Sequence, residues 1–190
     1  MKLRYKTTTL PAICVFVLII VCFSCNKDGN PNSKTIIKCV TCANGGICTN
    51  GTCICPIGYE GVSCETLSID KFLGSWNVSE QGTLTAFRNY TVEIVNNSLT
   101  SFGNTVQIQD LYDTFPEFVI TSYVIVDSLF IPSQQISGKT FIGKGYIHSN
   151  PSFGQNGTIT MRYAVTNNTT GAVDDFGYYS SATSASNWVR

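Results

Sequence analysis

The stretch that decides the fold is FVITSYVIVDSLFIPSQQISGKTFIGKGYI, residues 118–147. It contains three short runs, over 118–126, 128–132 and 140–147, that are rich in Val, Ile, Thr, Tyr and Phe. These residue types are enriched in β-strands. The segments between the runs carry the Ser, Asp and Gly residues that turns favour. We therefore predict three consecutive strands in this part of the chain.

The same pattern extends through residues 67–190. Further runs of this kind occupy 75–80, 89–95, 105–109, 158–165 and 176–183. About eight short strands separated by turn signals are typical of an antiparallel barrel or a sandwich. The only helical signal is a single turn at 70–73, with Ser68 as its expected cap. We predict an all-β domain over 67–190, either an eight-stranded antiparallel barrel or a β-sandwich.

Residues 1–24 have the pattern of a secretory signal peptide. A basic start is followed by an almost wholly apolar run over 10–23, which is shorter than the ~20 residues that span a bilayer. Ser24-Cys25 then resembles the cleavage site of bacterial lipoproteins of the Bacteroidota type, in which the cysteine receives the lipid. The resemblance implies lipidation at Cys25, such as with palmitate, and a tether over 25–38. Simple secretion with a free Cys25 thiol is the alternative.

Six cysteines lie close together in residues 39–65. They are Cys39, Cys42, Cys48, Cys53, Cys55 and Cys64. So short a segment cannot build an adequate hydrophobic core, and disulfides supply the missing stability in exported proteins. A zinc site is the rival interpretation, but the segment has no histidine and follows a signal peptide. The spacing alone leaves 15 pairings of six cysteines open.

The turns and spacing of this segment, CANGGIC at 42–48 followed by CICPIGYEGVSCE at 53–65, resemble an EGF-like module. The resemblance implies the pairs Cys39–Cys48, Cys42–Cys53 and Cys55–Cys64. Calcium-binding members of that family carry acidic residues before the first cysteine, whereas residues 35–38 read TIIK. We expect no metal in this module.

The segment DKFLGSWNV, residues 70–78, resembles the first strand of lipocalin-like proteins, where Gly74 and Trp76 would lie at the barrel floor. The small β-domains of Bacteroidota-type lipoproteins share such a start. Eight strands enclose an interior that is filled by side chains or holds one small ligand. The simpler interpretation of Trp76 is a large core aromatic residue.

Charge and histidine content argue against several function classes. The chain has 190 residues with 12 basic and 12 acidic side chains, and this neutrality argues against nucleic-acid binding. A Ser-His-Asp site would have to join His148, the only histidine, to Asp110 or Asp127, and the sequence motifs of such hydrolases are absent. We expect the pair Asp174-Asp175 to be solvated. We predict no catalytic residue, cofactor or metal.

These features together predict a non-enzymatic, extracytoplasmic protein that is lipid-anchored through Cys25 to the outer membrane or cell surface. Its function would be interaction or adhesion with a protein or glycan partner. A lipocalin-like carrier of a small hydrophobic ligand is the alternative.

Overall fold

Short antiparallel strands make up nearly all the regular structure of the described residues, which are 41–97, 103–113, 118–148 and 157–190 of the computed structural model. The strands are β1 (Ile47–Thr49), β2 (Thr52–Ile54), β3 (Tyr59–Glu60), β4 (Thr66–Leu67), β5 (Gly74–Glu80), β6 (Arg88–Asn96), β7 (Thr105–Gln109), β8 (Val119–Ile125), β9 (Ser128–Ile136), β10 (Lys139–His148), β11 (Thr158–Asn167), β12 (Val173–Phe176) and β13 (Ser186–Val189). One 3-10 turn, η2 (Ser68–Lys71), precedes β5. The predicted all-β class is confirmed.

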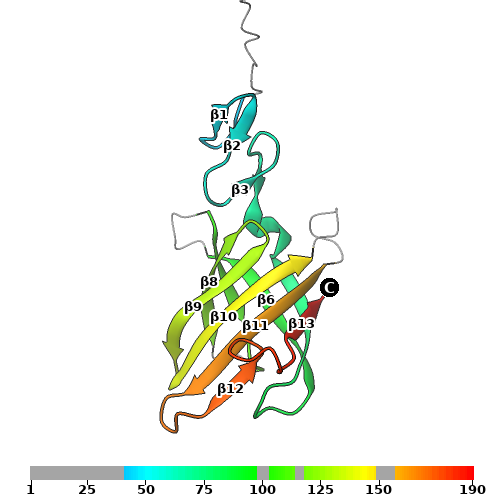
Figure 1. Ribbon diagram of the computed structural model, residues 1–190, viewed down its shortest axis with the longest axis vertical. Helices are drawn as coiled ribbons and strands as arrows, with labels where there is room; N and C mark the ends of the chain where they lie inside the picture. The colour runs from blue at the N-terminus through cyan, green and yellow to red at the C-terminus, as the bar shows by residue number, and fades with distance from the viewer. Residues whose placement is uncertain (1–40, 98–102, 114–117, 149–156) are drawn as a thin grey trace, which may run out of the picture. The chain divides into compact units, whose positions relative to one another are not determined.

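Eight of these strands close into an antiparallel barrel (Figure 1). Strands β5 to β11 follow in chain order, each paired with the next, and β13 lies between β11 and β5. Trp188 of β13 is opposite Val78 of β5 on one side and Ile159 of β11 on the other. Closure pairs the strands around the ring, which removes the exposed edges of an open sheet. The chain therefore adopts the barrel rather than the sandwich.

The barrel interior is filled by large apolar side chains. The largest fully buried ones are Trp76, Trp188, Tyr163, Phe72, Phe141 and Phe176. Trp76 is a core residue whose indole Nε1 donates a hydrogen bond to the carbonyl of Phe72 at 2.8 Å. Gly143 gives the core room, because a Cβ atom there would lie 2.6 Å from Cβ of Tyr163. The inward-facing positions of the barrel strands thus carry a core of large side chains.

The last barrel strand differs from the prediction for residues 176–183. The first half of β11 pairs with β13 and its second half with β12, so residues 177–185 leave the sheet between the two strands. Gly177 starts this excursion with φ +79°, a conformation that favours glycine. The aromatic pair Tyr178-Tyr179 resembles a strand in composition, but the Asp175 carboxylate accepts hydrogen bonds from both backbone N–H groups. These two N–H groups are therefore not available for the hydrogen bonds of a β-sheet.

The EGF-like segment is held by disulfides and tight turns. Cys42 is bonded to Cys53 and Cys55 to Cys64, two of the pairs that the resemblance implies. The hairpin β1–β2 turns at Asn50-Gly51, where both residues have positive φ, as two-residue hairpin loops require. These features place stabilising covalent bonds where the segment has little core of its own.

The turn η2 forms without the expected cap. Leu67 precedes it as the N-cap and makes no side-chain capping bond, while the buried Ser68 hydroxyl has no hydrogen-bond partner among the described residues. Lys71, at the end of the turn, instead connects three parts of the chain. Its Nζ lies 2.8 Å from Glu60 Oε2 in β3 and 2.6 Å from Asp127 Oδ1 in the β8–β9 turn. These ion pairs link the EGF-like segment to the barrel.

Candidate functional site

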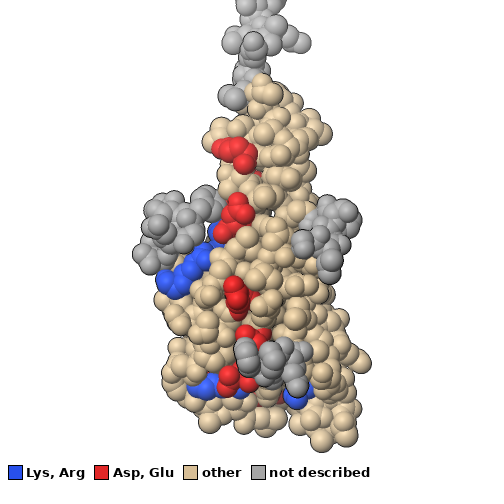
Figure 2. Space-filling model, turned by 180° about the vertical axis from the view of Figure 1, so that it is seen from behind, with Lys and Arg blue, Asp and Glu red and all other residues tan. Residues whose placement is uncertain are grey.

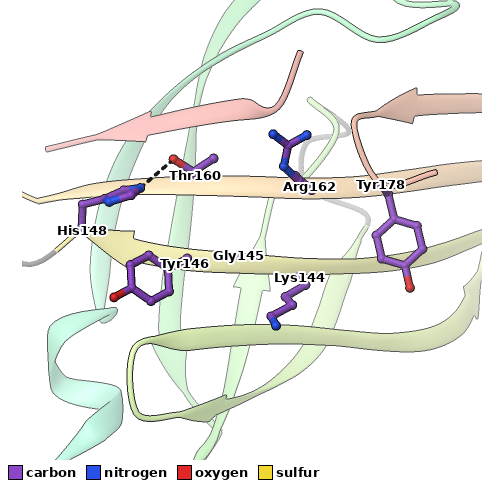
Figure 3. A pocket seen from close by; sticks show the side chains of 7 residues that line it. All are labelled: Lys144, Gly145, Tyr146, His148, Thr160, Arg162 and Tyr178. Atoms are coloured by element: carbon purple, nitrogen blue, oxygen red, sulfur yellow. Dashed lines mark hydrogen bonds between the residues drawn. The ribbon is translucent and has the colours of Figure 1, made fainter. Parts of the chain in front are cut away.

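The candidate site is a groove on the outer surface of the barrel (Figure 3). It is lined by Lys144, Gly145, Tyr146, His148, Thr160, Arg162 and Tyr178. The first four belong to β10, the next two to β11, and the last follows β12. The hollow has a volume of about 440 Å³, within the range of roughly 300–1,000 Å³ that ligand pockets occupy.

Strand alternation and register determine which side chains face the groove. Inward residues of β10 alternate with the exposed residues Lys144, Tyr146 and His148. The pairing of β10 with β11 sets Lys144 opposite Arg162 and Tyr146 opposite Thr160. Successive side chains point to opposite faces of a strand, so the same two strands fill the core and build the groove.

Tyr178 reaches the groove from the loop that interrupts the last barrel strand. The Asp175 carboxylate, which is 6% exposed as a residue, accepts hydrogen bonds from the backbone N–H groups of Tyr178, Tyr179 and Ser180 at 2.8, 3.1 and 3.0 Å. The Thr183 hydroxyl donates to it as well. A buried carboxylate with this many donors fixes the loop and therefore the position of Tyr178.

Arg162 joins that loop to the barrel wall. Its Nη1 donates a hydrogen bond to the carbonyl of Gly177 at 3.1 Å. Glycine is favoured at 177 by its φ of +79°, and a Cβ there would also lie 3.0 Å from the Thr183 carbonyl oxygen and 2.6 Å from the Arg162 Nη1 that donates this bond. Within the described part of the chain, the other guanidinium N–H groups of Arg162 have no partner. A guanidinium carries five N–H donors in a planar fork, so Arg162 offers unused donors to a ligand.

A row of aromatic and cationic side chains extends from the groove across the outside of the barrel. Tyr123, Phe130, Lys144 and Arg162 occupy matching positions on four neighbouring strands. The rings of Tyr123 and Phe130 are stacked at 5.0 Å, and Lys144 Nζ lies 5.1 Å from the centre of the Phe130 ring. An exposed cation–π contact is worth only ~0.5–1 kcal/mol, so the ammonium group remains available to an anion.

The structure does not assemble the catalytic constellation considered for His148. Its Nε2 lies 3.1 Å from Thr160 Oγ1, and its ring meets that of Tyr146 edge-on. The Asp127 carboxylate pairs with Lys71, and no described carboxylate contacts His148, including that of Asp110. His148 is therefore one wall of the groove.

The acidic pair Asp174-Asp175 is buried, which corrects the expectation that it is solvated. Asp174 accepts hydrogen bonds from the backbone N–H groups of Leu84 and Thr85 and from the hydroxyls of Thr85 and Tyr112. Burial raises the pKa of Asp174, but these hydrogen bonds outweigh burial and hold the pKa below its ordinary value. Each aspartate thus organises one loop. Among the described residues, no cluster of three or more His, Cys, Asp or Glu side chains is placed to bind a metal.

A buried carboxylate inside the barrel is a feature that the sequence analysis missed. Glu80 accepts hydrogen bonds from Arg88, Tyr90, Tyr163 and Ser186, all between 2.6 and 3.2 Å. Alternation along β5, in which Trp76 and Val78 are also buried, was the available signal for its inward position. This network connects β5, β6, β11 and β13. None of its members lines the groove.

The predicted lipidation site Cys25 and residue Cys39 lie outside the described residues. Cys48, the partner that the EGF-like resemblance implies for Cys39, is disulfide-bonded. No helix within the described residues combines the length and apolar character needed to cross a membrane.

Comparisons with known proteins find a short similarity. A Giardia intestinalis protein described as "Neurogenic locus notch homolog protein" is 36% identical over 55 residues, covering 24% of this chain and 9% of that protein. The chain thus spans about a tenth of the length of this relative. No family model matches the chain, and no solved structure matches it. The similarity and the disulfides fit an EGF-like module.

Proposed function

We propose that this chain is a non-enzymatic, extracytoplasmic recognition protein that binds its partner through the outer groove. The observation that carries the proposal is the construction of the groove. Exposed tyrosine rings and two cations line it, with no aspartate or glutamate among the described lining residues, and buried Asp175 fixes the loop that supplies Tyr178. A site held in place before binding loses less conformational entropy when its ligand arrives.

Disulfides support a location outside the cytoplasm. The pairs Cys42–Cys53 and Cys55–Cys64 are typical of oxidising compartments. We propose in addition that a lipid on Cys25 anchors the chain to the outer membrane or cell surface. Two acyl chains give stable attachment, whereas one gives only reversible binding.

The large side chains buried in the barrel favour recognition over the alternative of a hydrophobic carrier. Carriers of lipocalin type hold their ligand inside the barrel, where this chain packs residues such as Trp76, Tyr163 and Trp188. The groove, in contrast, is open to solvent and carries two cationic side chains, Lys144 and Arg162.

The test of groove binding uses the full chain and an immobilised panel of extracellular polysaccharides, proteins and anionic vesicles. The variant Arg162→Ala/Tyr178→Ala should bind at least about tenfold more weakly than the parent chain, given the loss of a charged donor and a ring. Lys139→Ala, which removes a cation from β10 outside the groove, is the matched control. Equal binding by the parent and the double variant across the panel would overturn the proposal.

The anchor has its own test. Cells that express the full chain are supplied with a palmitate analogue, and incorporation into the protein is measured. We expect label in the parent chain and none in Cys25→Ala. Label that survives this substitution, or its absence from the parent chain, would contradict anchoring at Cys25.

A further inference from the structure

We infer that the groove binds an acidic carbohydrate, with the carboxylate of a uronic-acid unit against Arg162 and Lys144 and a sugar ring against Tyr178. This inference rests on the proposed function and names the chemical class of its ligand. It follows from the charge, the ring surfaces and the backbone pairing of the groove.

The positive charge of the groove favours a negatively charged ligand. Arg162 and Lys144 are opposite each other in the register of β10 and β11, with the guanidinium directed to Gly177 and the ammonium group to the Phe130 ring (Figure 3). No aspartate or glutamate is among the described residues that line the groove. Asp175, in the segment that carries Tyr178, has its carboxylate occupied by backbone N–H groups. In the view from behind, where β10 and β11 are turned away, acidic side chains instead follow one another down the surface (Figure 2). The groove is therefore a local positive site on a chain with no net charge.

The planar guanidinium of Arg162 favours an anion of matching planar shape. One N–H is used by Gly177, which orients the planar group, and the others are free among the described residues. A planar fork of N–H donors matches a carboxylate with two parallel hydrogen bonds. Lys144 adds a second, mobile charge that leaves the Phe130 ring at little cost.

Two tyrosines supply the surface for a sugar. Tyr146 and Tyr178 are 47% and 36% exposed, and both line the groove. The C–H groups of a pyranose face carry partial positive charge and pack on the negative face of an aromatic ring. Thr160 and His148, whose Oγ1 and Nε2 atoms lie 3.1 Å apart, stand beside Tyr146 (Figure 3) and add polar atoms that can hydrogen-bond a sugar hydroxyl.

Backbone pairing disfavours an extended peptide as the ligand. Peptides that bind to sheets commonly add a strand at a free edge. The groove lies over the paired strands β10 and β11, whose register runs unbroken from Lys139↔Asn167 to His148↔Thr158. A ligand here must be recognised by side chains, as a sugar acid is.

The test measures binding of the full chain to oligomers of galacturonic acid by calorimetry at low salt. The comparison ligands are neutral galactose oligomers of the same length, sulfated oligosaccharides, acidic peptides and anionic vesicles. We expect the galacturonate oligomer to bind best, and added salt to weaken it because exposed charges are screened.

Variants locate the ligand. Arg162→Ala and Tyr178→Ala should each lower the affinity about tenfold, while Lys139→Ala should leave it unchanged. Lys144→Ala forms the second arm, because Lys144 donates no hydrogen bond within the described residues and its loss does not threaten the fold. Thermal unfolding is followed for every variant.

Each outcome separates this inference from the function on which it rests. Equal affinity for the neutral oligomer, or groove-dependent binding of only a sulfated glycan, a peptide or a vesicle, overturns the uronic-acid ligand and leaves the groove as a recognition site. Galacturonate binding that is unaffected by both Arg162→Ala and Lys144→Ala overturns the assignment to the groove. Absence of binding to the entire panel overturns both.

Discussion

The hydroxyl group of Tyr163 lies 2.9 Å from Oε1 and 3.0 Å from Oε2 of Glu80 in the barrel interior. Tyr163 is on β11 and Glu80 ends β5, so the contact joins two strands that are separated by 83 residues. Ser186 of β13, the strand between them, donates to the same carboxylate at 2.6 Å. The hydrogen bonds from Tyr163 and Ser186 to Glu80 therefore connect β11, β13 and β5 where the barrel closes.

Removing the Tyr163 hydroxyl should destabilise the barrel. Tyr163→Phe keeps the ring that stacks on Phe176 but removes one donor to a buried charge, and such hydrogen bonds are worth roughly 1.5–3 kcal/mol. Urea unfolding should show a loss of this size. Tyr146→Phe, on the exposed side of β10, is the control and should change little. Equal stability of Tyr163→Phe and the parent chain would contradict a structural role for the contact.

The same network predicts a loss of stability at alkaline pH. Burial and then the charge of Glu80 raise the pKa of Tyr90, and burial raises the pKa of Tyr163 well above its ordinary value. Above about pH 10 the unfolded tyrosines lose protons while the folded ones retain them. The free energy of unfolding should therefore fall as the pH rises through this range. Tyr90→Phe should make the fall less steep, as measured by urea unfolding at several pH values, and an unchanged slope would refute this cause.

At acid pH, Asp174 should control part of the stability. Its folded pKa lies below its ordinary value, so its contribution is complete above the unfolded value of about 3.9 and is lost as the pH falls through the folded pKa. Asp174→Asn should thus be less stable than the parent chain at pH 7, and the difference should shrink toward pH 3. Asp113→Asn, whose carboxylate accepts no hydrogen bond among the described residues, is the matched control. A difference that is constant with pH would count against this mechanism.

Local chemistry made parts of this structure predictable. Asn50-Gly51 forms the expected hairpin turn, and the buried position of Trp76 follows from its size and from its alternation with the polar residues Ser75 and Asn77. Most predicted strands are present, because β-branched and aromatic residues between turns leave few other options.

The remaining features depend on contacts between distant residues. The loop at 177–185 forms because the Asp175 side chain accepts hydrogen bonds from N–H groups that would pair with a neighbouring strand. The amino-acid composition of 176–183 does not indicate this side-chain interaction. The groove requires the register that sets Lys144 opposite Arg162. His148 suggested chemistry by its type, whereas its position makes it a neighbour of Thr160 and Tyr146.

The β8–β9 turn contains a residue that its backbone disfavours. Val126 has φ +51° and is 53% exposed, and a left-handed conformation costs roughly 1–2 kcal/mol for most residues. Asp127 holds the turn through its ion pair with Lys71 and its carbonyl bond from the Ile147 N–H. Val126→Asn should raise the free energy of unfolding by about 1 kcal/mol, because asparagine tolerates this conformation. Val126→Thr keeps the branched Cβ and should give no gain; a similar gain from both variants would show that polarity, not strain, is responsible.

Asp175 should determine how well Tyr178 is positioned in the groove. In Asp175→Asn, one oxygen still accepts from Tyr178 and Tyr179, but an NH2 group faces the Ser180 N–H and leaves it unpaired. Amide hydrogen exchange at 178–180 should therefore accelerate, while exchange in the paired centre of β6 should not change. Affinity for the acidic oligosaccharide should fall through loss of preorganisation.

Asp174→Asn is the matched control for this last change, because Asp174 is the adjacent buried carboxylate but holds the loop at Leu84 and Thr85 instead. It should leave the exchange at 178–180 and the affinity of the groove unchanged. If both variants loosen residues 178–180 equally, the two loops move together and Asp175 has no separate role. If Asp175→Asn loosens the loop but the affinity stays the same, Tyr178 does not contact the ligand. A ring that is free to move would lose more conformational entropy on binding, and the affinity would fall.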